Sequence, residues 1–159
     1  MHFLSRRFVS ALLMSAVALL TTGCGPDAPP SKPASVSAVD DPAYRDAVAK
    51  LTSMDREAEK LFAQGKGDAA ADLITQGEVI ASKILGVPHP SVEAAEAAAD
   101  LDQLYGRMLL SNRHFGWARL LFQKNLARWK HWEPQTPETE RRLRLAQDAI
   151  AECDRLMTQ

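Results

Sequence analysis

Residues 85–105, LGVPHPSVEAAEAAADLDQLY, decide the fold of this chain. Residues 86–90, with one glycine and two prolines, have the composition of a turn. After the turn, apolar residues recur at three- and four-residue spacing, which is the period of an amphipathic helix and not of a strand. The stretch therefore predicts the end of one helix, a short turn and the start of the next helix.

The same helical periodicity continues through the chain from Asp41 onward, and strand-like alternation of apolar and polar residues is absent from the sequence. Turn residues interrupt the periodic pattern at four places, namely 65–67, 86–90, 111–112 and 133–137. The sequence therefore predicts an all-α fold of five antiparallel helices within residues 41–159.

Three of the predicted helices begin with a polar residue followed by proline. These dipeptides are Asp41-Pro42, His89-Pro90 and Thr136-Pro137. A polar cap followed by proline suits a helix start, because the first amides of a helix have no intrahelical acceptor. The three prolines are spaced by 48 and 47 residues, which indicates an internal repeat.

A shift of 48 residues also superposes apolar positions of the second and fourth predicted helices. The superposed pairs are Ala70 on Ala118, Leu73 on Leu121 and Ile74 on Phe122. A single helix pair cannot bury its apolar stripe alone, so neighbouring pairs stack and a terminal helix covers the last exposed face. We therefore expect two helix–turn–helix units and a fifth helix that caps them.

This pattern resembles tetratricopeptide repeats, especially the long-helix variety of kinesin light chains. Residues 85–90 are similar to the turn between repeats of that variety. The packing positions that carry the likeness are Leu101, Leu104, Tyr105, Ala118, Leu121 and Phe122. The resemblance covers about residues 41–157 and implies an array of α-hairpins. A period near 48 is longer than the 34 residues of standard repeats, so a generic α-hairpin array is the alternative.

The first 23 residues have the layout of a secretory signal peptide, with a short basic head and an apolar run over residues 8–20. This run is too short to span a bilayer comfortably as a helix. The Gly23-Cys24 junction resembles the lipobox of bacterial lipoproteins, although Thr21 stands where leucine is most common. The resemblance implies that Cys24 becomes the lipidated first residue of the mature protein, carrying acyl chains such as palmitate.

Lipidation at Cys24 predicts a protein anchored in the cell envelope, and an ordinary secreted protein with a chance cysteine is the alternative. Gly25, and not aspartate, follows the cysteine, which favours the outer membrane in an organism with two membranes. Residues 24–40 contain four prolines among Ser, Ala and Gly and predict a linker that holds the folded domain off the membrane surface.

The formal net charge of −1 gives no reason to expect a nucleic-acid partner. The charges are nevertheless distributed unevenly. Residues 40–103 carry 13 acidic and 6 basic side chains, whereas residues 107–144 carry nine basic and three acidic ones. Such an asymmetry is able to steer an acidic partner or to lie against anionic headgroups. The alternative is that these charges lie on solvated helix faces.

The sequence contains none of the common hydrolase, zinc-protease or nucleotide-binding motifs. His89 is explained as a helix cap, and His114 and His131 lie on different sides of one predicted helix. Cys153 falls in step with apolar neighbours and is expected to be a small buried residue. We therefore predict no catalytic residue, no metal, no cofactor and no enzyme activity.

The fourth predicted helix is aromatic and basic, and four of its residues are candidates for binding a partner protein. They are Trp117, Lys124, Arg128 and Trp132. Trp and Arg residues dominate the energetics of protein interfaces. Trp129 is expected in the core, whereas Trp117 and Trp132 lie off the main apolar stripe and are expected to be exposed. The alternative is that the basic side chains only form a solvated outer face of the helix.

Together these features predict a lipid-anchored envelope protein that acts as a scaffold or adaptor for an unidentified envelope protein, in the assembly of an envelope complex. An envelope enzyme or enzyme subunit acting on peptidoglycan is one alternative, and two deeply buried, adjacent carboxylates in a cleft would favour it. A purely structural lipoprotein is the other alternative. An open polar face would favour the adaptor.

Overall fold

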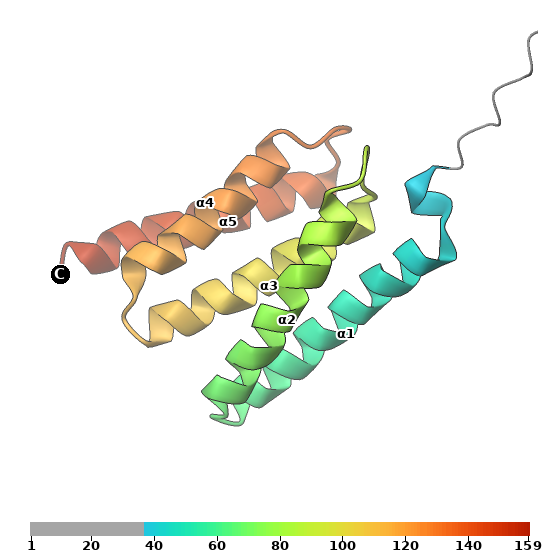
Figure 1. The fold of residues 1–159 in the computed structure, drawn as a ribbon. Helices are drawn as coiled ribbons and strands as arrows, with labels where there is room; N and C mark the ends of the chain where they lie inside the picture. The colour runs from blue at the N-terminus through green and yellow to red at the C-terminus, as the bar shows by residue number, and fades with distance from the viewer. Residues whose placement is uncertain (1–36) are drawn as a thin grey trace, which may run out of the picture. The chain divides into compact units, whose positions relative to one another are not determined.

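The computed structural model describes residues 37–159, so the predicted signal peptide, Cys24 and most of the predicted linker lie outside the described residues. The described part consists of a 3-10 turn, η1 (Ala38–Asp40), and five α-helices: α1 (Pro42–Ala63), α2 (Gly67–Leu85), α3 (Val92–Ser111), α4 (Phe115–Lys130) and α5 (Pro137–Met157). Figure 1 shows that each helix runs antiparallel to the one before it. The predicted all-α, five-helix fold is confirmed.

Two of the three predicted helix starts are confirmed. The Asp41 carboxylate accepts a hydrogen bond of 2.9 Å from the Ala43 amide at the start of α1. At the start of α5, Thr136 and Thr139 form a capping box: the amide of each residue donates a hydrogen bond to the hydroxyl oxygen of the other. Both helices have proline as their first residue, as predicted.

The third predicted start, His89-Pro90, is wrong. His89 has a positive φ of 55° and belongs to the turn, and α3 begins at Val92. Ser91 is the N-cap, because its hydroxyl accepts a hydrogen bond of 3.2 Å from the Ala94 amide. The short oxygen-bearing side chain of serine reaches the free amides of the first turn, whereas histidine is not among the preferred caps.

The turns inside the two helix pairs are equivalent after a shift of 48 residues. Gly65 and Arg113 both have a positive φ, of 74° and 62°. One residue later, the amide of Lys66 donates to the Leu61 carbonyl at 2.9 Å, and the amide of His114 donates to the Leu109 carbonyl at 2.8 Å. Hydrogen bonds of this kind are typical of a helix C-terminus that is followed by a residue in the left-handed conformation. The backbone thus repeats with the period that the sequence predicts.

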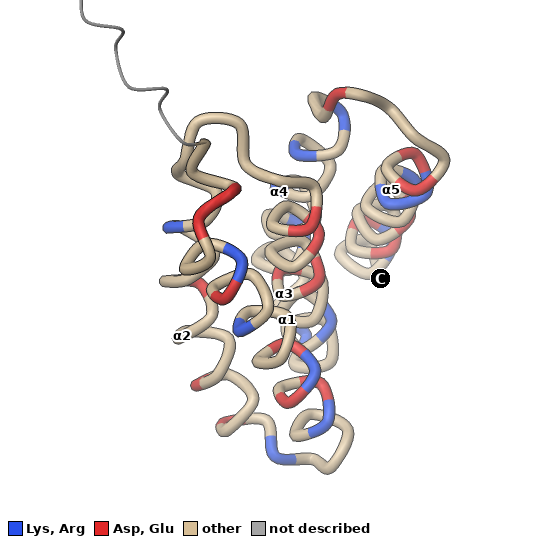
Figure 2. The backbone as a smooth tube through the Cα atoms, turned by 90° about the vertical axis from the view of Figure 1, so that its right-hand side faces the viewer, with Lys and Arg blue, Asp and Glu red and all other residues tan. Residues whose placement is uncertain are grey.

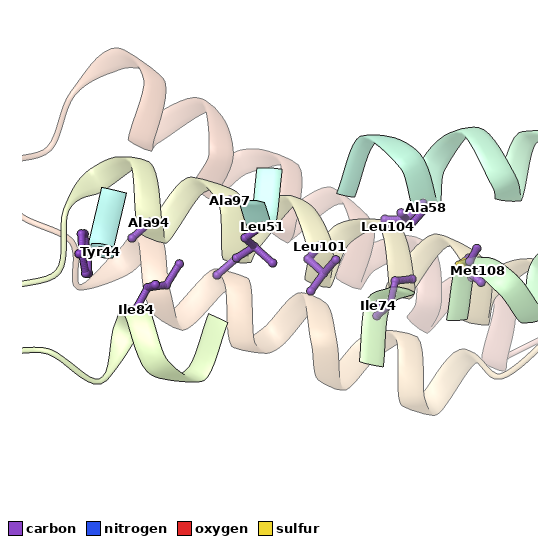
Figure 3. Close-up of a cluster of buried hydrophobic side chains, with 12 residues drawn as sticks. Tyr44, Leu51, Ala58, Ile74, Ile84, Ala94, Ala97, Leu101, Leu104 and Met108 are labelled. Carbon is purple, nitrogen blue, oxygen red and sulfur yellow. The ribbon is translucent and has the colours of Figure 1, made fainter. Parts of the chain in front are cut away.

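Helix α3 is the centre of the fold, because it packs against α1, α2 and α4, while α5 packs mainly on α4. The main apolar cluster lies between α1, α2 and α3, and Figure 3 shows its side chains. The positions that the 48-residue shift superposes as Ala70 on Ala118 and Ile74 on Phe122 are all buried. The two units therefore use equivalent residues for their internal packing.

The N-terminal edge of the domain extends into the predicted linker. The 3-10 turn η1 precedes α1, and its Val39 side chain packs against the main apolar cluster. Tyr44, near the start of α1, accepts a hydrogen bond of 3.0 Å through its hydroxyl from the Ser91 amide. This bond ties the start of the first helix pair to the start of the second. Within residues 37–159, none of the helices is both long and apolar enough to cross a bilayer.

A second cluster joins α3, α4 and α5. Phe122 and Cys153 are fully buried in it together with Ala118, which confirms the prediction that Cys153 is a small core residue. The Phe122 ring lies so close to Gly106 of α3 that a Cβ atom at this glycine would be 2.4 Å from the ring carbon Cε1. Only glycine therefore allows α3 and α4 to approach this closely.

Replacing Gly106 with alanine should lower the free energy of unfolding by about 1–3 kcal/mol, because the new methyl group overpacks the contact with Phe122. Urea unfolding of the two proteins measures the difference. Gly116→Ala on α4 is the matched control, because a Cβ atom there meets nothing within 4 Å. The control should be neutral or gain up to about 1 kcal/mol from helix propensity. Equal effects of the two substitutions would contradict the close contact.

Candidate functional site

A groove runs between α2 and α4 and has α3 as its floor; we call it the α2–α4 groove. Both α2 and α4 pack on α3, but they make no extensive contact with each other. In Figure 1, α3 is visible between them. Three adjoining hollows form the groove: one of about 490 Å³ between the α1–α2 turn, α2 and α3, one of about 580 Å³ between α3 and α4, and one of about 220 Å³ that α2, α3 and α4 line together. Tyr105 and Leu109 line both of the first two hollows, and Lys124 lines both the second and the third.

Each wall of the α2–α4 groove is a stripe of residues at helical spacing, so the lining side chains of one helix lie on one face. The lining residues from α2 include Asp68, Ala71, Glu78 and Ser82. Those from α4 include Trp117, Leu121, Lys124 and Arg128. The floor from α3 includes Leu101, Asp102, Tyr105, Met108 and Leu109.

One end of the α2–α4 groove is apolar and open to solvent. Trp117 is 67% exposed and Leu120 is 55% exposed, and both line the hollow above Tyr105 and Leu109. Scattered exposed apolar residues are ordinary, but a contiguous apolar patch beside a hollow marks an interaction site. This end therefore has the properties of a surface that another molecule covers.

The other end of the α2–α4 groove is polar and is built around a buried carboxylate. Asp102 is only 4% exposed and accepts hydrogen bonds from Lys124 at 2.8 Å and from Arg128 at 3.0 Å. Arg128 also donates to the side-chain oxygen of Asn125, whose amide group donates to the Ala99 carbonyl at 3.0 Å. This network fixes α4 against α3.

The structure brings three of the four predicted partner-binding residues to the α2–α4 groove. Trp117 is exposed there, the Lys124 side chain is 54% exposed, and the Arg128 side chain is only 11% exposed. Arg128 is therefore mainly committed to Asp102. The role of all these residues in binding stays a prediction.

Trp132, the fourth of these residues, lies elsewhere, and the expectation that it is exposed is wrong. It is half-buried, and its ring centroid is 6.0 Å from that of Trp129, which is fully buried as predicted. Trp132 and Leu143 of α5 both pack against the cluster around Trp129. The reason is that α4 ends at Lys130, so Trp132 no longer follows the direction that the helical period assigned to it.

The floor and the α2 wall of the groove were missed by sequence reasoning. The sequence indicates Tyr105 only as a packing position, and Asp68 and Glu78 only as members of the acidic segment 40–103. Tyr105 and Leu109 line one hollow with Trp117, and Glu78 lines another with Lys124 and Arg128, because α2 and α4 stand apart over α3, which is a tertiary feature. The repeat itself is the one signal in the sequence that points to this gap. When two hairpins stack, α3, the first helix of the second hairpin, lies between α2 and α4, the second helices of the two hairpins.

The edges that α3 shares with α1 and α5 carry ion pairs. Arg142 of α5 lies 2.6 Å from Asp100 and 3.6 Å from Glu96 of α3, and its guanidinium lies 5.4 Å from the Trp129 ring centroid. Arg107 and Glu59 join α3 to α1 at 2.6 Å. Figure 2 shows mainly acidic positions along α3 and both signs along α5. These pairs hold the helices together at the edges of the domain.

Asp55 of α1 has the most perturbed carboxyl group of this region. Its Oδ1 atom is buried without a hydrogen-bond partner. Burial, together with the negative charges of Asp100 and Glu59, raises the pKa of Asp55 from 3.8 to about 6, although the positive charge of Arg107 opposes this. Asp100 itself is largely exposed and paired with Arg142, so Asp55 and Asp100 are not the deeply buried carboxylate pair that the enzyme alternative requires.

In the part of the chain that the structure describes, no three His, Cys, Asp or Glu side chains are grouped so that they could hold a metal ion. Comparisons with known protein families, with curated proteins and with solved structures found no match. The geometry of the α2–α4 groove is therefore the main structural indication of function.

Arg128→Ala should lower the free energy of unfolding by about 2–3 kcal/mol, because it takes away a hydrogen-bonded partner of the buried Asp102 carboxylate. Lys124→Ala, which removes the exposed partner of the same carboxylate, should cost no more than about 1 kcal/mol. Urea unfolding at neutral pH compares the two variants. Equal losses would contradict the unequal burial of the two cations.

Asp55→Asn tests the raised pKa of Asp55. The folded protein holds this proton more tightly than the unfolded chain, so the carboxyl group lowers stability progressively as the pH rises from about 4 to about 6. We expect the variant to gain about 1 kcal/mol at pH 8, after allowance for solvent screening, and nothing at pH 4. Thermal and urea unfolding at both pH values provide the measurement.

Glu57→Gln is the matched control for this substitution, because Glu57 is an exposed carboxylate on the same helix. It should show no comparable gain at pH 8. A gain of the same size in both variants, or one that does not depend on pH, would contradict the assignment of the raised pKa to Asp55.

Proposed function

We propose that this chain is a lipid-anchored envelope protein that binds another envelope protein through the α2–α4 groove and serves as an adaptor or scaffold. The supporting observation is the open apolar end of the groove, where Trp117 and Leu120 stand exposed beside a hollow floored by Tyr105 and Leu109. Aromatic anchors next to apolar pockets carry most of the binding energy in protein interfaces. An adaptor needs such a surface and no reaction of its own.

The anchor is the second part of the proposal. Lipidation at Cys24 attaches the domain to a membrane and keeps the groove within reach of other envelope proteins. The sequence after Cys24 favours the outer membrane in an organism with two membranes. Stable attachment requires more than one acyl chain, because a single chain gives only marginal membrane binding.

The peptidoglycan-enzyme alternative has one observation in its favour, the raised pKa of Asp55. A carboxyl group with a pKa near 6 suits a general acid. Its neighbour Asp100 is largely exposed and ion-paired, so it offers no matching second group. Asp55→Asn separates the two functions, because adaptor binding through the α2–α4 groove should survive this substitution.

In-cell crosslinking tests the adaptor, with a tagged, lipidated protein and mass spectrometry of the envelope fraction. We expect one stoichiometric protein partner, lost in Trp117→Ala and in Leu120→Ala because both substitutions remove exposed apolar area from the groove. Leu145→Ala is the matched control, since Leu145 is an exposed leucine on α5 outside the α2–α4 groove. Equal capture by the Leu120 and Leu145 variants, or no enriched partner at all, would contradict the proposal.

The same experiment tests the anchor when Cys24 is replaced by alanine. Cys24→Ala should remove the protein from the membrane fraction and change its processing, because the acylated residue is gone. An unchanged membrane fraction with unchanged processing would contradict the lipid anchor, whatever the outcome at the groove.

A further inference from the structure

We propose that the occupant of the α2–α4 groove is an amphipathic α-helix of the partner protein, with basic residues along the edge that meets α2 and acidic residues along the edge that meets α4. This inference rests on the proposed function, because it names the chemistry of the partner at the same surface.

The dimensions of the groove match a short helix. Its floor extends from Leu101 of α3 to Asn112, the residue that caps the end of this helix, which is about 16 Å at 1.5 Å per residue, or three helical turns. A helix of this length places the apolar side chains at its positions i, i+3 or i+4 and i+7 in a groove. Helix α3 itself is seated in a similar way, because it packs on both α1 and α2. A partner helix in the groove would likewise pack on two helices, α2 and α4.

The two walls of the groove carry charges of opposite sign. The charged lining residues of α2 are Asp68 and Glu78. Within residues 37–159 neither of them forms an ion pair with another side chain. On the α4 side, the charged lining residues Lys124 and Arg128 share the single carboxylate of Asp102, so this wall keeps one positive charge in excess.

This arrangement favours a helix with segregated charges over other occupants. Opposite charges across an interface give specificity and orient the partner. An anionic membrane would be attracted by the α4 wall but repelled by Asp68 and Glu78, and a flat bilayer surface does not reach the α3 floor. A partner helix with cations on one edge and carboxylates on the other places an opposite charge against each wall. Because only one direction of the helix brings its cations to α2 and its carboxylates to α4, the charges also fix the direction in which it lies.

Two fluorescent, stapled helical peptides of identical composition are the probes. Both carry the same leucine stripe; one has lysines on one edge and glutamates on the other, and the second has both residue types mixed on each edge. Fluorescence anisotropy measures their binding to the full lipidated protein in zwitterionic nanodiscs, with empty nanodiscs as the blank. We expect the segregated peptide to bind at least ten-fold more tightly than the mixed one, and Trp117→Ala to weaken its binding at least ten-fold.

Charge reversal on the α2 wall provides the decisive variant. Asp68→Lys combined with Glu78→Lys should reduce the preference for the segregated peptide to less than two-fold, because both walls are then basic. Asp72→Lys is the control, since Asp72 is an exposed acidic residue of α2 that does not line the hollows, and it should keep the preference.

Several outcomes would overturn the inference. They are equal affinity for the two peptides, an unchanged preference in the double variant, binding no stronger than that to empty nanodiscs, or a self-associated protein whose contact the peptides do not displace. If in-cell capture depends on Leu120 but the peptides are not discriminated, the adaptor proposal stands and only the helix with segregated edges is rejected.

Discussion

The rest of the structure depends on the packing of one helix, α3, against three others, α1, α2 and α4. Five alanines in its first half are buried, and Gly106 in its second half admits the ring of Phe122. Small side chains are required because a helix packed on several sides has little room between the axes. Larger residues at these positions would force α1, α2 or α4 away from α3 and open the core.

The same packing of α3 creates the candidate binding surface. Because α2 and α4 both pack on α3 and make no extensive contact with each other, a strip of α3 with Tyr105 and Leu109 stays accessible between them. The repeat architecture thus produces the α2–α4 groove as a direct result of stacking two hairpins. The side chains on its rims, above all Trp117, then decide what the groove is able to bind.

Ion pairs between helices account for part of the uneven charge distribution of the chain. Five ion pairs join a basic residue of segment 107–144 to an acidic residue of segment 40–103: Arg107–Glu59, Lys124–Asp102, Arg128–Asp102, Arg142–Glu96 and Arg142–Asp100. Each pair connects two different helices. Part of the asymmetry is therefore used in contacts between helices, and Asp68 and Glu78 are among the acidic residues outside these pairs.

The sequence by itself determined the five helices, the caps at Asp41 and Thr136 and the 48-residue repeat, because helix period, capping and turn formation depend on near neighbours. It also indicated the buried Trp129 and the exposed Trp117. Only the tertiary structure decided that Arg128 is held by Asp102, that Trp132 lies against Trp129 and that α2 and α4 stand apart over α3. The pairing of Arg128 with Asp102 and the gap over α3 depend on how whole helices cross, and contacts between residues 22 or more positions apart leave no local pattern in the chain. The place of Trp132 depends on where α4 ends, at Lys130, and on the packing of α5 beside Trp129.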